Sequence, residues 1–288
     1  MQEIREVLRK ATKKLRKISK RPSLDIEILL AHVLKISKAK LFAYPEKKIT
    51  KKQHSKFKKL VIRRLQHEPI AYITKNKEFY GLRFYVDKNV LIPRPETELL
   101  VESALELVKQ LTRKDKRLTI ADIGTGSGCI AITLAKYTER VRIYALEISD
   151  SVLKIAKRNA KKHKVLSKIT FLKGNLFEPL KNRKLDIIIA NLPYLTTKQW
   201  MTLMPDIRKY EPRQALDGGK DGLDYIKKLL SQITETKFPP KAIILEIGGK
   251  KEINKIKKLA KSLWPKSQIK VKKDLRKLDR VIIISEIS

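Results

Sequence analysis

Four consecutive residues that follow an apolar run could bind a planar amide or amine: Asn191, Leu192, Pro193 and Tyr194. The side-chain oxygen of Asn191 and the backbone carbonyl of Leu192 can each accept a hydrogen bond from a nitrogen that carries two protons. The ring of Tyr194 can pack on the planar group. Fixed dipoles of this kind stabilise the positive charge that grows on a nitrogen as its lone pair attacks. The four residues are therefore candidate catalytic residues, although the tetrapeptide alone is also typical of a strand followed by a turn.

A glycine-rich segment at 121–128, Ala-Asp-Ile-Gly-Thr-Gly-Ser-Gly, is typical of a loop that approaches a ligand closely. Its glycines are spaced more tightly than the G-x-G-x-x-G of dinucleotide-binding loops, and it lacks the Lys-Ser/Thr pair of a P-loop. This spacing favours a ligand without a pyrophosphate, such as S-adenosylmethionine, and Asp122 is placed to help hold the loop and the methionine ammonium group. A dinucleotide-dependent oxidoreductase stays open as an alternative. The candidate cofactor-binding residues here are Asp122, Gly124, Thr125, Gly126, Ser127 and Gly128.

Two further strand ends supply polar groups for the same ligand. Glu147 ends an apolar stretch and offers two charged acceptors to a pair of ribose hydroxyls. Asn175 follows the next apolar stretch, where its amide could meet the edge of an adenine ring while Leu176 covers one face. The loop, the acid and the amide together favour a methyl donor. They also place Asn191 beside that donor, so Asn191 is a candidate cofactor contact as well.

The elements that would position these residues alternate between strands and helices from Arg117 onward. Short apolar strands are expected at LTIADI, RIYALEI, KITFLKGN, LDIIIAN, KAIILEI and RVIIISEI, with helical segments between them. This alternation predicts an α/β fold with a mostly parallel sheet and helices on both faces. Ligands bind at the carboxyl ends of the strands in such sheets, which is where the candidate residues lie.

The chain before this region has a different pattern. Residues 1–72 are predicted to form short basic helices, with Ser23 as the N-cap of one of them. Residues 73–96 alternate aromatic and β-branched residues around Gly81, which predicts a β-hairpin. We therefore expect a helical domain at 1–72, a hairpin linker at 73–96 and an α/β domain at 97–288.

The composition excludes several classes of protein. The single cysteine, Cys129, rules out a disulfide framework and favours a reducing, cytoplasmic location. No apolar run approaches the ~20 residues that cross a bilayer, and the histidines show no metal-ligand spacing, so we expect no metal site. The formal charge of +37 attracts polyanions. Because the basic residues are spread over the whole chain, specific nucleic-acid binding is not expected. We also expect a monomer.

The motifs together resemble a known group of enzymes. D-I-G-T-G-S-G, Glu147, G-N-L-F-E-P and N-L-P-Y are similar to the amino-methyltransferases with an Asn-Pro-Pro-Tyr motif, which include adenine-N6 DNA methyltransferases and glutamine-N5 protein methyltransferases. The flanking segments KEFYGLRFYVDKNVLIPRPETELLVE (77–102) and YEPRQALDGGKDGLDYIKKLL (210–230) resemble the peptide chain release factor glutamine methyltransferase family. LDIEILLAHVL and EPIAYIT, nearer the N-terminus, resemble it too, so the match extends over nearly the whole chain.

This resemblance implies a Rossmann-like class I methyltransferase domain with a mostly parallel seven-stranded sheet, preceded by a small helical bundle that docks the substrate and by a hairpin linker. The implied activity is methylation of the side-chain amide nitrogen (N5) of the glutamine in the Gly-Gly-Gln loop of class I peptide chain release factors. S-adenosyl-L-methionine would be the cofactor and S-adenosyl-L-homocysteine its product. Residues 191–194 would bind the glutamine. Glu147, Leu176 and Asn191 would bind the cofactor with the glycine loop, and Arg94, Pro95 and Thr97 would line the same site.

One departure and two alternatives accompany this interpretation. The family usually has proline where this chain has Leu192, but leucine keeps the backbone carbonyl, and Pro193 still favours an extended conformation before it. An adenine-N6 nucleic-acid methyltransferase is the first alternative, because the tetrapeptide is shared and the charge is strongly positive. A non-catalytic binding module on the translation machinery is the second. The segment 217–222, Asp-Gly-Gly-Lys-Asp-Gly, is expected to form a turn near the substrate mouth.

Overall fold

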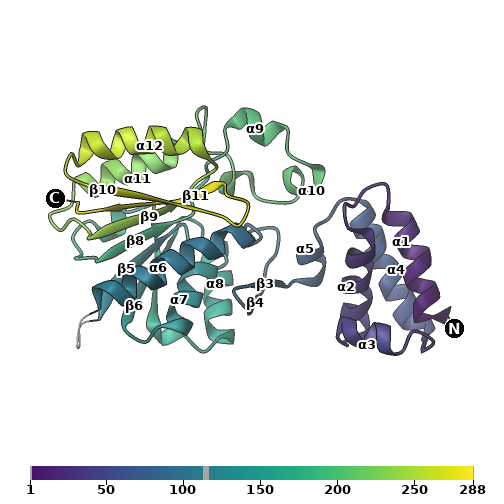
Figure 1. Cartoon of the computed structure of the whole chain (residues 1–288). Coiled ribbons are helices and arrows are strands. Elements are labelled where there is room, and N and C mark those ends of the chain that lie inside the picture. Colours follow the sequence, from purple (N-terminus) through teal and green to yellow (C-terminus); the bar gives the residue numbers. More distant parts are fainter. Residues whose placement is uncertain (1, 113–116, 288) are drawn as a thin grey trace. The chain divides into compact units, whose positions relative to one another are not determined.

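The computed structural model of the chain describes residues 2–112 and 117–287 and divides into two compact units (Figure 1). The first unit extends to Asn76 and also contains Met204–Tyr210. The second unit comprises Lys77–Leu203 and the chain from Glu211 onward. Within the described ranges, no helix is both long and apolar enough to cross a membrane.

The first unit is helical, as the pattern of short basic helices predicts. A buried cluster that includes Ile4, Leu30 and Phe57 forms its core. Ser23 is not an N-cap, because its helix already begins at Pro22, whose fixed φ suits a first helical position. The helices are α1 (Ile4–Leu15), α2 (Pro22–Leu34), α3 (Lys38–Ala43), α4 (Lys51–Leu65), α5 (Ile70–Thr74) and α10 (Pro205–Arg208), and two short strands, β1 (Gln2–Glu3) and β2 (Lys48–Ile49), pair antiparallel.

One ion-pair cluster connects separate segments of the helical unit. The guanidinium of Arg64, which is 6% exposed, lies 2.8 Å from a carboxylate oxygen of Asp25 and 2.8 Å from one of Asp206. Asp206 also lies 2.9 Å from Nδ1 of His67. A buried cation needs such partners, since an unpaired charge in the interior is strongly destabilising.

The second unit begins with the expected hairpin. Strands β3 (Lys77–Phe79) and β4 (Leu82–Phe84) pair antiparallel. Tyr80 and Gly81 connect them with positive φ angles of 51° and 70°, a geometry typical of a two-residue hairpin turn. An irregular segment then leads to a 3₁₀ turn at Pro95–Thr97 and to helix α6 (Glu98–Leu111).

A seven-stranded sheet in the order β10-β11-β9-β8-β5-β6-β7 forms the centre of this unit and confirms the predicted fold class. Five neighbouring strands are parallel, and β11 and β10 add antiparallel pairs at one edge. The strands are β5 (Leu118–Ile123), β6 (Val141–Glu147), β7 (Ile169–Lys173), β8 (Ile187–Ala190), β9 (Ala242–Glu246), β10 (Gln268–Lys273) and β11 (Asp279–Ser285).

Helices cover both faces of the sheet (Figure 1). One core joins the sheet to α11 (Asp224–Thr234) and α12 (Lys250–Leu263). The other joins it to α6, α7 (Cys129–Tyr137) and the end of α8 (Asp150–Lys162). Strand β5 has β6 on one side and β8 on the other, so the chain reverses its winding direction there. Open α/β sheets bind ligands at such a point.

Candidate functional site

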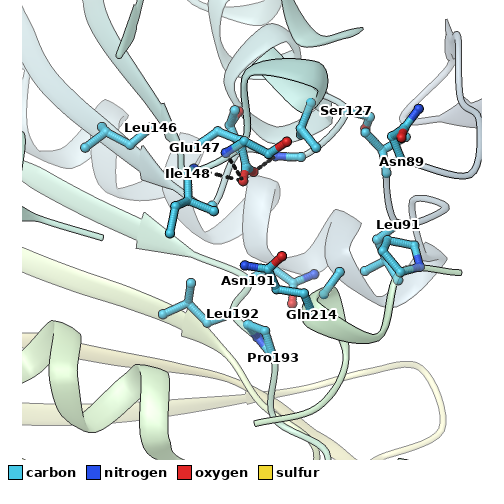
Figure 2. Close-up of a pocket in the computed structure, with 18 of the residues that line it drawn as sticks. Asn89, Leu91, Ser127, Leu146, Glu147, Ile148, Asn191, Leu192, Pro193 and Gln214 are labelled. Atoms are coloured by element: carbon cyan, nitrogen blue, oxygen red, sulfur yellow. Dashed lines mark hydrogen bonds between the residues drawn. The ribbon is translucent and has the colours of Figure 1, made fainter. Parts of the chain in front are cut away.

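A cavity of about 330 Å³ lies where the parallel strands of the second unit end. Its size falls in the range of small-molecule sites, which begins at about 300 Å³. Figure 2 shows Glu147 and Asn191 facing the open space from different strands, with Leu91 beside it. Most of the residues predicted from the sequence line it: Arg94, Thr97, Gly124, Thr125, Gly126, Ser127, Glu147, Asn175, Leu176, Asn191, Leu192 and Pro193.

The glycine loop connects the end of β5 to the start of α7. Gly124, Gly126 and Gly128 all have positive φ angles, which residues with a Cβ rarely adopt. A Cβ on Gly128 would lie 2.8 Å from Cδ1 of Ile132, so the loop also needs glycine there for its contact with α7. Gly128 therefore allows the loop to pack closely against α7, and it does not line the cavity.

Asp122 lies beneath this loop and does not line the cavity either. Its side chain is fully buried and accepts hydrogen bonds from the Thr125 hydroxyl at 2.7 Å and the Ala131 backbone N–H at 3.2 Å. Within the described chain, its second oxygen, Oδ1, has no hydrogen-bond partner. Burial raises the pKa of the Asp122 carboxyl to about 6. The Asp122 side chain thus holds the loop through Oδ2 alone.

Glu147 ends β6 and its carboxylate is held against the loop. Oε2 accepts from the Gly126 backbone N–H at 3.2 Å, and Oε1 accepts from the Ile148 N–H at 2.9 Å (Figure 2). Burial raises the pKa of the Glu147 carboxyl, and these backbone N–H groups, together with that of Ser149, oppose the rise. Each carboxylate oxygen has further lone pairs, so the group can still bind a ligand in the cavity.

Asn175 and Leu176 follow β7 and both line the cavity. Leu176 has a φ of +56°, an uncommon conformation for a residue with a branched side chain. Backbone strain of this kind persists where the surrounding structure requires it, and it often occurs at ligand sites. Contact of these two residues with a bound ligand stays a prediction.

Asn191 follows β8 and its amide has a fixed orientation. Nδ2 donates a hydrogen bond to the Thr97 hydroxyl oxygen at 3.1 Å. Oδ1 is therefore the atom that can accept a hydrogen bond from a molecule in the cavity. Leu192 is 4% exposed, and its Cδ2 would lie 3.2 Å from a Cβ on Gly124, so this side chain packs against the glycine loop.

Two predicted residues, Tyr194 and Pro95, do not line the cavity. The Tyr194 hydroxyl donates to Oε1 of Glu246 at 3.4 Å, and its ring lies against Gly248. Burial and the nearby Glu246 carboxyl raise the pKa of the Tyr194 hydroxyl. Tyr194 thus contacts the protein interior in this structure, and contact between its ring and a planar acceptor stays a prediction.

The segment Leu216–Gly222 packs against the backbone at the end of the tetrapeptide and forms hydrogen bonds with the next residue, Leu195. The Leu195 N–H donates to the Leu216 carbonyl at 3.1 Å, and the Gly218 N–H donates to the Leu195 carbonyl at 2.7 Å. A Cβ on Gly222 would lie 2.4 Å from the Tyr194 carbonyl oxygen. Glycine at positions 218 and 222 therefore lets this segment approach the backbone of Pro193 and Tyr194 closely.

A buried carboxylate anchors the segment that follows the hairpin. One oxygen of Glu211 accepts from the Ile92 N–H at 3.0 Å, and the other accepts from the Arg94 guanidinium at 2.5 Å. The Glu211 side chain is 1% exposed. This carboxylate fixes the backbone on one side of the cavity and holds Arg94 in its lining.

Several lining residues are not predicted from the sequence: Lys88, Asn89, Val90 and Leu91 after the hairpin, Ile148, Ser149, Ser151 and Val152 after β6, and Pro212, Gln214 and Ala215. The first and last groups lie in the two flanking segments that carry the family resemblance, which is a signal for their place in the site. The middle group directly follows Glu147. Among the residues that the structure describes, no cluster of three or more His, Cys, Asp or Glu side chains could hold a metal ion.

Two protein-family models match the chain: the PrmC N-terminal domain at residues 6–74 and the methyltransferase small domain at residues 99–209. A release factor glutamine methyltransferase of Bacillus cereus is 35% identical over 259 residues, 89% of this chain and 90% of the relative. Proteins with the same name from Thermodesulfovibrio yellowstonii and Coxiella burnetii are 36% and 42% identical, over 281 and 233 residues. These alignments cover 96% and 81% of this chain, and 98% and 81% of the relatives.

Solved structures share the fold at lower identity. The hMettl16 catalytic domain in complex with MAT2A 3′UTR hairpin 6 is 17% identical with a TM-score of 0.59, over 78% of this chain and 83% of that one. The N-terminal domain of human METTL16 in complex with SAH is 20% identical with a TM-score of 0.55, over 72% of this chain and 76% of that one. At such identities the similarity shows the fold alone.

Proposed function

Because the chain belongs to the release factor glutamine methyltransferase family, we propose that it methylates the side-chain amide of a release factor glutamine, with S-adenosylmethionine as the methyl donor. The observation that carries this proposal is the orientation of Asn191. Its Nδ2 is engaged by Thr97 and its Oδ1 remains as an acceptor at the cavity. An acceptor suits an amide nitrogen, which presents two N–H donors.

The residues around the glycine loop fit the cofactor. Asp122 holds the loop from beneath, and Gly124, Thr125, Gly126 and Ser127 line the cavity where the cofactor would bind. The Glu147 carboxylate, already fixed by backbone N–H groups, would bind the ribose hydroxyls, and Asn175 and Leu176 would contact the adenine. The bound cofactor supplies an electrophilic methyl group.

The tetrapeptide would bind the glutamine. Oδ1 of Asn191 and the backbone carbonyl of Leu192 would accept hydrogen bonds from the two N–H groups of the substrate amide. As the nitrogen lone pair localises, these fixed dipoles stabilise the growing positive charge. Because Thr97 holds the Asn191 amide in place beforehand, this acceptor does not have to reorganise during the reaction.

The remaining expectations belong to the same proposal. The helical domain at 1–72 would dock the release factor, and the hairpin linker at 73–96 would connect it to the methyltransferase domain at 97–288. The glutamine would be that of the Gly-Gly-Gln loop in class I factors, and the product would be S-adenosylhomocysteine. A monomer, a cytoplasmic location and the absence of specific nucleic-acid binding stay predictions.

The test is methyl transfer from labelled cofactor to a class I release factor, compared with the same factor carrying a Gln→Ala change in its Gly-Gly-Gln loop. Label is expected in the first protein only, with a mass increase of one methyl group on the loop glutamine. Label that persists in the altered factor would contradict the assignment. Transfer to DNA or RNA, in the same assay, would support the adenine-N6 alternative instead.

A further inference from the structure

Asn159 is a fully buried residue in the last turn of helix α8, and it is not among the residues that line the cavity. Its side-chain amide has one acceptor atom and two N–H donors. Burial of such a group is unfavourable unless its donors and acceptor are paired. The partners of Asn159 therefore indicate why a polar side chain is placed there.

The Asn159 amide forms three hydrogen bonds with backbone groups of two other segments. Oδ1 accepts from the Tyr85 N–H at 2.8 Å, and Nδ2 donates to the Tyr85 carbonyl at 3.0 Å. Nδ2 also donates to the Ser127 carbonyl at 2.9 Å. Because a flipped amide would place its NH₂ group against the Tyr85 N–H, only one orientation satisfies all three contacts.

The bond to Ser127 fixes one peptide unit of the glycine loop. Asn159 holds the carbonyl of this unit, and its N–H, which belongs to Gly128, donates to the Thr125 carbonyl at 2.8 Å. The peptide unit is thus held at both ends, and it closes the turn formed by residues 125–128. Three residues of that turn, Thr125, Gly126 and Ser127, line the cavity.

The bonds to Tyr85 fix the segment that follows the hairpin. Tyr85 comes directly after β4, and residues 88–91, slightly further along the chain, line the cavity. Asn159 pairs with both the N–H and the carbonyl of Tyr85, as the backbone of a neighbouring strand would. One side chain therefore connects part of the cavity wall to the glycine loop.

Other side chains at the end of α8 hold the hairpin independently of Asn159. Nζ of Lys162 donates to the Arg83 carbonyl at 2.5 Å, and Nε2 of His163 lies 3.0 Å from the same oxygen. These two contacts reach β4, whereas the contact of Asn159 with Ser127 reaches the glycine loop. Loss of the Asn159 amide should therefore loosen the loop while the hairpin stays attached to α8.

We propose that Asn159 is a positioning residue, which holds the Ser127–Gly128 peptide and the Tyr85 backbone so that the loop is ordered before the cofactor binds. This inference rests on the proposed function, because the proposed cofactor is the ligand of the loop. Asn159 acts through backbone groups of other residues. A loop that is ordered beforehand gives tighter binding, since ordering a mobile loop on association reduces affinity.

The first test measures the dissociation constant of S-adenosylhomocysteine by calorimetric titration of Asn159→Ala and Asn159→Leu. Both variants lose all three hydrogen bonds, and leucine keeps the branched shape that fills the buried space. The dissociation constant should rise about 10-fold, the change expected if about one tenth of the free molecules have an ordered loop. An unchanged dissociation constant in a folded variant would overturn the inference.

Two control variants leave the contact between Asn159 and the loop intact. Thr133→Val removes a fully buried hydroxyl that donates to the Cys129 carbonyl within α7 at 2.6 Å. Lys162→Ala removes a contact with the Arg83 carbonyl. Both should keep the wild-type dissociation constant, even where the free energy of unfolding falls. An equal rise in the control variants would show a general loss of structure and would overturn the inference.

Hydrogen exchange without any ligand keeps this test separate from the proposed function. The Gly128 N–H lies in the turn, and the Asp186 N–H donates to the Thr119 carbonyl of the sheet at 2.8 Å. The ratio of the first exchange rate to the second should rise about 10-fold in Asn159→Leu, because only the loop opens more often. An unchanged or lower ratio would overturn the positioning role. A raised ratio in a protein whose wild type does not bind S-adenosylhomocysteine would overturn the proposed function alone.

Discussion

Gly218 lies so close to Pro193 that a Cβ atom on Gly218 would be 2.5 Å from the Pro193 carbonyl oxygen. Real Cβ atoms do not approach a carbonyl oxygen this closely, and the neighbour is backbone, so one of the two segments must move. Because Pro193 is part of the tetrapeptide that carries Asn191, the backbone of the site depends on a residue far along the chain.

Gly218→Ala should therefore lower kcat/KM for release factor methylation by about 100-fold, the effect expected of a displacement of roughly 1 Å. The dissociation constant of the cofactor should change much less, since the glycine loop is not displaced. Gly81→Ala, in the hairpin turn, is a control with a strained φ of +70° but no close contact. Equal kcat/KM in both variants would show that the close approach of Gly218 to Pro193 does not affect activity.

Glu147→Gln should weaken cofactor binding about 10- to 100-fold, since hydrogen bonds to a charged group contribute about 1.5–3 kcal/mol. The amide keeps the size of the side chain, but its NH₂ end cannot accept from Gly126 or from a ribose hydroxyl. Calorimetric titration with S-adenosylhomocysteine measures this effect without a protein substrate. An unchanged dissociation constant would remove Glu147 from the proposed cofactor contacts.

Asp122→Asn should change how stability depends on pH. The folded-state pKa of about 6 is above the ordinary value of 3.8, so the native state holds its proton more tightly than the unfolded state. The stability from this group is fully present below about pH 4 and is lost as the pH rises toward 6. At about 1.4 kcal/mol per pKa unit, the loss approaches about 3 kcal/mol at neutral pH.

The measurement is the free energy of unfolding of wild type and Asp122→Asn, compared by urea titration between pH 4 and 8. As the pH rises, the free energy of unfolding of the wild type should fall relative to that of Asp122→Asn. A difference that is constant over this range would mean that Asp122 does not titrate there.

Leu192→Pro tests the departure from the usual family sequence. The backbone carbonyl remains, so methyl transfer should persist, but the buried side chain that packs on Gly124 is reduced. We expect the free energy of unfolding to fall by about 2 kcal/mol, near the lower end for truncation of a buried leucine. Leu192→Ala loses the packing without the rigid ring, so higher kcat in the proline variant than in the alanine variant would isolate the effect of rigidity.

Much of this site can be predicted from the sequence, because parallel strands bring their carboxyl ends to one edge of a sheet. Glu147, Asn175 and Asn191 each follow an apolar run, and all three line one cavity. The direction in which each side chain points is less predictable. Asp122 and Tyr194 belong to the same motifs, yet one lies beneath the loop and the other faces Glu246.

Other features depend on contacts between distant segments. Glu211 and Gly218 act on the site through backbone groups of Ile92 and Pro193, and nothing in their local sequence indicates these partners. The sequence pattern does not predict strand β10 as a separate element. Its Ile and Val residues alternate with lysines, which is typical of an edge strand protected by charge but gives a weak local signal.

The ion pairs of Arg64 with Asp25 and Asp206 make the helical unit discontinuous in sequence. One of its carboxylates comes from Met204–Tyr210, a segment inserted from the middle of the chain. A fragment that stops at Asn76 would therefore leave the buried guanidinium with a single anionic partner. In a chimera of two relatives, grafting the N-terminal region alone would transfer an incomplete unit. The piece around Asp206 has to be exchanged with it, as a second, matching graft.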